Sequence, residues 1–221
     1  LVLEEVDAGR LSLDQVITAS TTFSAGLTAN GSTQDIRAGE EMSLRDLLYC
    51  LLVASANEAS NILAEAVDGS VSAFVERMNQ RAVSLGCENT HFANPHGLHN
   101  DDHYTTAHDI YLIARAAMEN DTFRTIVSTH SYEIPATNMH KARLFYSTNA
   151  LLVTWYYRES YIYDKTIGIK TGTTDEGGYC LLSAFRYEGK TYIIGVFGCP
   201  ETTDRFADTL QLFNETVGYE G

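Results

Sequence analysis

One hairpin in the second half of the chain limits the possible folds more than any other feature. Two apolar runs, GYCLLSAFRY and KTYIIGVFG, flank Glu188 and Gly189, a pair suited to a tight turn between antiparallel strands. Most of the preceding chain instead has apolar residues at helical spacing, and an amphipathic stretch with Phe206 and Phe213 follows the hairpin. This order predicts an α/β (α+β) fold, in which a helical lobe is followed by an antiparallel sheet that one C-terminal helix closes.

The predicted helices carry local start and stop signals. Ser43 and Asp46 form a capping box before a leucine-rich stretch, and Thr106 and Asp109 repeat that pattern before a further helix. The helix predicted over 71–85 ends at Gly86, as helices commonly do. We therefore expect the helical lobe to cover about residues 1–129, and the sheet with its closing helix about residues 130–221, within a single domain 1–221.

The strand YIIGVFG, residues 192–198, is apolar almost throughout. This pattern is typical of a strand that is covered on both faces and central in its sheet. One side of the strand is expected to pair with residues 179–187, but the remaining sequence has no evident partner for the other side. A missing strand is one explanation, and we expect this apolar edge to pair with another segment, to pair with a partner chain or to stay open.

Composition excludes several classes of function. A net charge of −14 argues against binding to nucleic acid or to anionic membranes by general electrostatics. The chain has no apolar run of about 18 residues, so we expect no transmembrane segment. No metal or other cofactor is expected, because the four cysteines are scattered and the histidine-rich loop contains Gly and Asn, which disfavour a helix with paired imidazoles.

Two short motifs carry the chemistry. The chain has four lysines, and Lys170 lies in an apolar strand directly before a threonine, a glycine and two further threonines, in the run KTGTT. The other motif is SAN, residues 55–57, at a break between two helices. Each has a simpler explanation: Lys170 as a lysine that protects a sheet edge, and Ser55 and Asn57 as helix-capping residues. Arg205, before the closing helix, has the alternative of an ordinary surface charge.

The two motifs and their surroundings resemble a known family. KTG and SxN are two of the three motifs of serine penicillin-binding proteins and β-lactamases. The segments HFANPHGL, HYTTAHDIYLIARAAM and GIKTGTTDEGGYCLLSA are similar to the low-molecular-weight D-alanyl-D-alanine carboxypeptidases, over roughly residues 1 to 217. This resemblance implies a β-lactamase or penicillin-binding transpeptidase-like fold. It also implies an extracytoplasmic enzyme that trims the terminal D-alanine from peptidoglycan stem peptides and is acylated by β-lactam antibiotics.

The resemblance also assigns roles to individual residues. Ser55 would relay a proton to the leaving D-alanine, Asn57 would hold the substrate amide, and Lys170 would place positive charge on the opposite wall of the cleft. The Thr171 hydroxyl and the Arg205 guanidinium would bind the substrate carboxylate. Gly172 would let the substrate approach, and the Thr173 amide would bind the oxyanion. His96 would lie on the cleft rim.

The sequence departs from the family at its first motif. That motif, S-x-x-K, supplies the nucleophilic serine and the lysine that activates it, but no lysine of this chain follows a serine by three residues. The opening helix, which ends near Gly9, is similar to the end of the helix that begins with this motif in the family. We therefore expect an N-terminally truncated chain that lacks the N-terminal strands of the sheet and is inactive alone. The alternatives are a non-catalytic member that acts as a binding or scaffold module, and a β-lactamase.

Overall fold

The computed structural model describes residues 1–154 and 160–218. The chain forms two compact units, one of residues 1–113 with 131–145 and the other of residues 114–130 with 146–221. Both units therefore combine segments that are far apart in the sequence. The expectation of a single domain with a lobe boundary near residue 130 stays a prediction.

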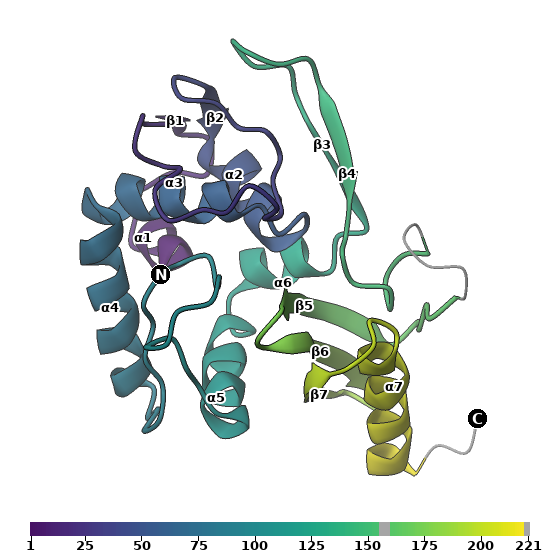
Figure 1. The fold of residues 1–221 in the computed structure, drawn as a ribbon. Helices are drawn as coiled ribbons and strands as arrows, with labels where there is room; N and C mark the ends of the chain where they lie inside the picture. The colour runs from purple at the N-terminus through teal and green to yellow at the C-terminus, as the bar shows by residue number, and fades with distance from the viewer. Residues whose placement is uncertain (155–159, 219–221) are drawn as a thin grey trace. The chain divides into compact units, whose positions relative to one another are not determined.

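The first unit is built mainly from helices (Figure 1). Its pairs of neighbouring helices are α1 with α3, α2 with α3, and α3 with α4, so α3 lies at the centre of the helical packing. Leu47, Ile62 and Leu63 are almost fully buried there. The elements that lie wholly or mainly in this unit are α1 (Val2–Asp7), β1 (Val16–Thr18), β2 (Glu41–Ser43), α2 (Leu44–Leu52), α3 (Asn57–Asp68), α4 (Val71–Ser84), α5 (Ala107–Ala117), β3 (Ser131–Ile134) and β4 (Arg143–Tyr146).

The predicted helix signals are confirmed. The Ser43 hydroxyl accepts a hydrogen bond from the Asp46 amide at 3.0 Å and donates one to the Asp46 carboxylate at 2.6 Å. The Thr106 hydroxyl accepts a bond from the Asp109 amide at 3.1 Å, at the start of α5. Helix α4 ends before Gly86, whose φ of +91° is a conformation that glycine adopts without strain. Local capping chemistry therefore sets these boundaries.

The second unit contains the sheet that was predicted from the hairpin (Figure 1). Its strands are antiparallel in the order β5-β6-β7, and α7 packs against β6 and β7. Glu188 and Gly189 form the turn between β6 and β7, and both have positive φ, as a tight hairpin turn requires. The elements are α6 (Asp121–Val127), β5 (Thr166–Thr174), β6 (Gly178–Tyr187), β7 (Lys190–Cys199) and α7 (Asp204–Val217).

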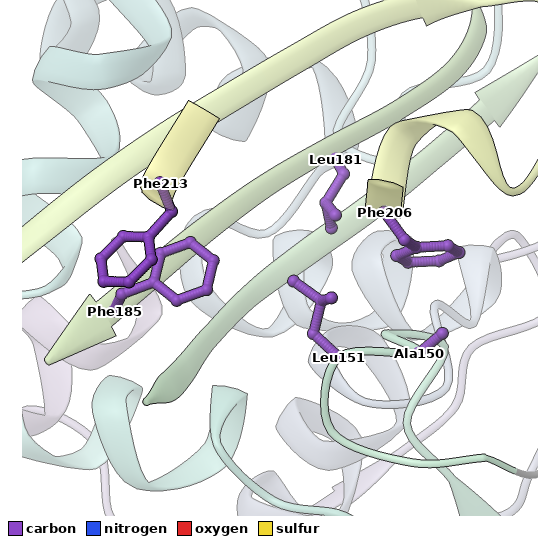
Figure 2. Packing of buried hydrophobic residues seen from close by; sticks show 6 residues of the cluster. All are labelled: Ala150, Leu151, Leu181, Phe185, Phe206 and Phe213. Carbon is purple, nitrogen blue, oxygen red and sulfur yellow. The ribbon is translucent and has the colours of Figure 1, made fainter. Parts of the chain in front are cut away.

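An aromatic core joins α7 to the sheet, as Figure 2 shows. Phe206 and Phe213 of α7 are fully buried with Phe185 and Leu181 of β6. The Phe185 and Phe213 rings stack with their centroids 4.4 Å apart. Burying aromatic side chains of this size contributes a large share of the packing free energy. The predicted role of the last helix, to close the sheet, is confirmed.

Among the described residues, β7 has a partner strand on one side only. The apolar pattern indicated a strand covered on both faces, but Gly195 and Phe197 are exposed, Phe197 to 44%. Strand β7 lies at the edge of the three-stranded sheet, with β6 as its partner. The open apolar edge is one of the outcomes expected for a strand whose neighbour is missing.

Helix α6 was not predicted, and it packs against the start of β5. Gly168 of β5 has φ of +136°, and a Cβ at this position would lie 2.7 Å from Cγ2 of Val127, the last residue of α6. Glycine is therefore required for this close approach. The contact fixes the strand segment that immediately precedes Lys170.

Candidate active site

The SAN motif lies in the turn between α2 and α3. Ser55 is half-buried and has φ of +62°, a conformation that is strained for a residue with a side chain and that is most common at functional sites. Asn57 is the first residue of α3, whose N-cap is Ala56, and the cap has no side-chain hydrogen bond. The alternative explanation of this motif as helix-capping residues is therefore wrong.

A distant loop supports Asn57. The Asn57 amide donates a hydrogen bond to the Ser32 carbonyl at 3.0 Å, and the Ser32 hydroxyl donates to the Ala54 carbonyl at 3.0 Å. A Cβ on Gly31 would lie 2.7 Å from Nδ2 of Asn57, so the loop backbone lies directly against the Asn57 side chain. Sequence reasoning missed these contacts, because the two segments are separated by more than a helix.

His96 belongs to the same unit and lies in the loop between α4 and α5. Its Nδ1 accepts a hydrogen bond from the Leu98 amide at 3.2 Å. Burial lowers the pKa of His96 to about 4, and the nearby His103 adds to this effect. His96 is therefore neutral at physiological pH, and its Nδ1 holds its own loop in place.

The KTG motif occupies the second half of β5, in the other unit. Lys170 is half-buried, and its ammonium donates a hydrogen bond to the Thr171 carbonyl at 2.9 Å. Burial, with the positive charge of Arg205 as the second cause, lowers the pKa of Lys170 to about 8. The side chain is thus still mainly a cation at pH 7, which is about one pH unit below its pKa.

Arg205, in the first turn of α7, lies beside this motif. The residue is only 5% exposed, so the alternative of an ordinary surface charge is wrong. Its Nη1 donates to the Thr173 hydroxyl at 3.0 Å and to the Gly172 carbonyl at 3.1 Å. The guanidinium also lies over the Tyr179 ring, 5.3 Å from its centroid. Arg205 therefore connects α7 to the end of β5.

A further hydroxyl contacts the motif. Thr148 follows β4 in the sequence, and its Oγ1 lies 2.6 Å from Oγ1 of Thr171. Its neighbour Asn149 accepts a hydrogen bond from the Leu151 amide at 3.0 Å, which fixes the turn that carries Thr148. Sequence reasoning missed Thr148, since a threonine outside any motif gives no signal of a site.

The second unit thus gathers two cations, three hydroxyls and one glycine around the end of β5. Cationic donors and hydroxyls suit a ligand carboxylate or a developing oxyanion. The first unit supplies the Ser55 hydroxyl and the Asn57 amide on one turn, with His96 on a separate loop. Among residues 1–154 and 160–218, no group of three or more His, Cys, Asp or Glu side chains is placed to hold a metal ion.

Comparison with known proteins agrees with this chemistry. The profile of the D-alanyl-D-alanine carboxypeptidase family matches residues 1–201. The chain is 31% identical to the D-alanyl-D-alanine carboxypeptidase DacF of Bacillus subtilis, over 97% of the chain and 52% of that protein. It is 33% identical to the D-alanyl-D-alanine carboxypeptidase of Streptomyces sp. strain K15, over 92% of the chain and 71% of that protein.

Solved structures support the same relation. The crystal structure of the Streptomyces K15 DD-transpeptidase matches with a TM-score of 0.84 at 32% identity, over 94% of this chain and 80% of that one. The D-alanyl-D-alanine carboxypeptidase DacD of Francisella tularensis also gives a TM-score of 0.84, at 28% identity, over 98% of this chain and 61% of that one.

These matches define a protein with the fold of the penicillin-binding DD-peptidases. The chain belongs to the D-alanyl-D-alanine carboxypeptidase family. It spans about half the length of the Bacillus subtilis relative.

Proposed function

We propose that the full-length protein containing this chain is a serine D-Ala-D-Ala carboxypeptidase, which removes the terminal D-alanine from peptidoglycan stem peptides through an acyl-enzyme. The observation that carries this proposal is the cluster on β5, where Lys170, Thr171 and Thr173 lie with the buried Arg205. Such a cluster suits a peptide that ends in a carboxylate. The family membership of the chain supports the same reaction.

Each residue has a role in this mechanism. The hydroxyl of Thr171 binds the substrate carboxylate, and the Lys170 and Arg205 cations favour that negative charge. The Thr173 amide stabilises the oxyanion of the tetrahedral intermediate. Gly172 lets the substrate backbone approach β5, because a glycine presents no Cβ.

The residues of the first unit have separate roles. Ser55 relays a proton to the leaving D-alanine, and the Asn57 amide holds a substrate amide. His96, neutral at physiological pH, contributes to substrate binding. The nucleophilic serine and its activating lysine lie outside residues 1–221, because no lysine in the chain follows a serine by three residues.

The proposal places the protein in the bacterial cell envelope, where its partners are stem peptides and β-lactam antibiotics. Among the described residues, β7 pairs with β6 alone, so its outer edge is free to pair with another segment or with a partner chain. No helix among the described residues is long and apolar enough to cross a bilayer.

Mass spectrometry of the full-length protein with penicillin tests this function. We expect a covalent adduct of the mass of the antibiotic, followed by slow release. If no adduct forms and no D-alanine is released from a stem-peptide mimic, the protein is a non-catalytic member of the fold. Rapid hydrolysis of the adduct, without D-alanine release, would instead identify a β-lactamase.

A further inference from the structure

A polar stripe on α3 contacts the long irregular segment between β1 and β2. Glu58, Asn61 and Glu65 are spaced three and four residues apart, so they lie on one side of the helix. Glu58 is 3% exposed and Asn61 is fully buried, although buried polar side chains are costly unless they are hydrogen-bonded. The hydrogen-bond partners of these buried polar side chains therefore matter for α3, the helix that starts with Asn57.

All three side chains bind residues 20–34, which we call the anchored loop. Glu58 Oε1 accepts hydrogen bonds from the Thr33 hydroxyl at 2.8 Å and from the Gln34 amide at 2.7 Å. Farther along the helix, Asn61 Nδ2 donates to the Phe23 and Ala25 carbonyls at 2.7 and 3.2 Å, and Glu65 accepts from the Ser20 and Thr22 hydroxyls at 2.5 and 2.7 Å. The stripe therefore holds the loop at three points along α3.

The first of these points lies next to Asn57. Gly31 and Ser32, which contact Asn57, directly precede Thr33, which Glu58 holds. The backbone of the anchored loop thus contacts both the backbone amide and the side-chain amide of Asn57. Because both bonds to Glu58 Oε1 are short and one of them comes from a backbone amide, they fix this contact more firmly than the loop backbone would alone.

We infer that Glu58 is a positioning residue. It holds the Gly31–Ser32 backbone against Asn57 and so sets where the side-chain amide of Asn57 meets a substrate amide. This inference rests on the proposed function of Asn57 and extends it to a residue outside every motif. The expected effect of losing Glu58 is a misplaced Asn57 rather than an unfolded helix, because Asn61 and Glu65 still hold the rest of the loop.

The test uses two β-lactams with the full-length protein. Benzylpenicillin carries a side-chain amide of the kind that Asn57 is proposed to hold, and aminopenicillanic acid lacks it. Glu58→Ala should lower the acylation rate for benzylpenicillin about tenfold, as a misplaced contact does, and change the rate for aminopenicillanic acid much less. Glu58→Gln keeps an acceptor oxygen, so it should restore most of the rate.

Two further variants separate positioning from general stability. Glu65→Ala releases the far end of the same loop and should leave the ratio of the two acylation rates unchanged. Gly31→Ala moves the Asn57 side chain directly, because its Cβ would lie 2.7 Å from Nδ2, and should reproduce the selective loss. The neighbouring, exposed Asn30→Ala is its control. Gly31→Ala also serves as the test if Glu58→Ala does not fold.

Amide hydrogen exchange provides a readout that does not depend on catalysis. The Gln34 and Asn57 amides, which donate to Glu58 and to Ser32, should exchange faster in Glu58→Ala than in Glu65→Ala. Equal losses for both β-lactams, or unchanged exchange at these two amides, would overturn the positioning role. Faster exchange in a protein that forms no penicillin adduct would instead keep the anchoring by Glu58 and reject the proposed function.

Discussion

Replacing Arg205 with alanine should lower the stability of the second unit and also weaken the binding of a substrate carboxylate. The guanidinium donates at 3.0 Å to the Thr173 hydroxyl and at 3.1 Å to the Gly172 carbonyl, and it is only 5% exposed. Alanine removes both hydrogen bonds, although Gly172 and Thr173 are exposed, so water can replace the guanidinium at these two acceptors. The hydrogen bonds from α7 to Gly172 and Thr173 of β5 are then lost.

The loss of stability follows from these two bonds. A hydrogen bond to a charged group contributes about 1.5–3 kcal/mol. We take the lower end of this range, because the substitution also removes the cost of burying the cation, and obtain about 3 kcal/mol for the two bonds. In a protein of this size, about 3 kcal/mol corresponds to a fall of roughly 6–12 °C in Tm.

Calorimetry and substrate kinetics on the full-length protein check this prediction. Arg205→Lys is the matched control: it keeps the charge but loses the planar fork, so it should retain part of the carboxylate preference and less of the stability. Arg205→Ala should weaken peptides with a free carboxylate by about 2 kcal/mol more than their amidated analogues. An unchanged Tm would refute the structural argument, and equal losses for both peptides would refute carboxylate recognition by Arg205.

Other predictions concern charge, capping and the missing nucleophile. Because the pKa of Lys170 is lowered to about 8, the side chain is a cation below that pH and neutral above it, so KM for carboxylate-ended peptides should rise as the pH increases through about 8. Lys170→Arg stays charged and should abolish this limb of the pH profile. Ser43→Ala removes the cap of α2 and should cost about 1 kcal/mol in urea unfolding. Residues 1–221 alone should release no D-alanine from a stem-peptide mimic, and steady turnover that an alanine substitution within the chain abolishes would show that the nucleophile is present after all.

The features that sequence reasoning predicted are those with a local physical cause. The cap of α2 by Ser43 and the turn at Glu188 and Gly189 each depend on a few adjacent residues, so the pattern predicts the structure directly. The KTG motif was found for the same reason: Lys170 stands out in an apolar strand of a lysine-poor chain. Local chemistry was sufficient for these elements.

The features that were missed depend on contacts between distant segments. Strands β1 and β2 are short, and the segment that joins them contains the whole anchored loop. No local pattern therefore marks them as partners. The contact of Gly31 with Asn57 and the bond between Thr148 and Thr171 appear only once the chain has folded.

Helix α3 holds only part of the anchored loop, so the part that it does not hold can change in sequence. The attachment points lie at residues 20–25 and 31–34, and the residues between them, 26–30, are mostly exposed. Side-chain changes at residues 27–29 should leave the attachments intact, because the loop keeps its length and the Gly31 amide keeps its hydrogen bond to the Thr28 carbonyl. Residues 27–29 are therefore the natural region for a randomised library, from which directed evolution could select variants with a new preference for acyl side chains.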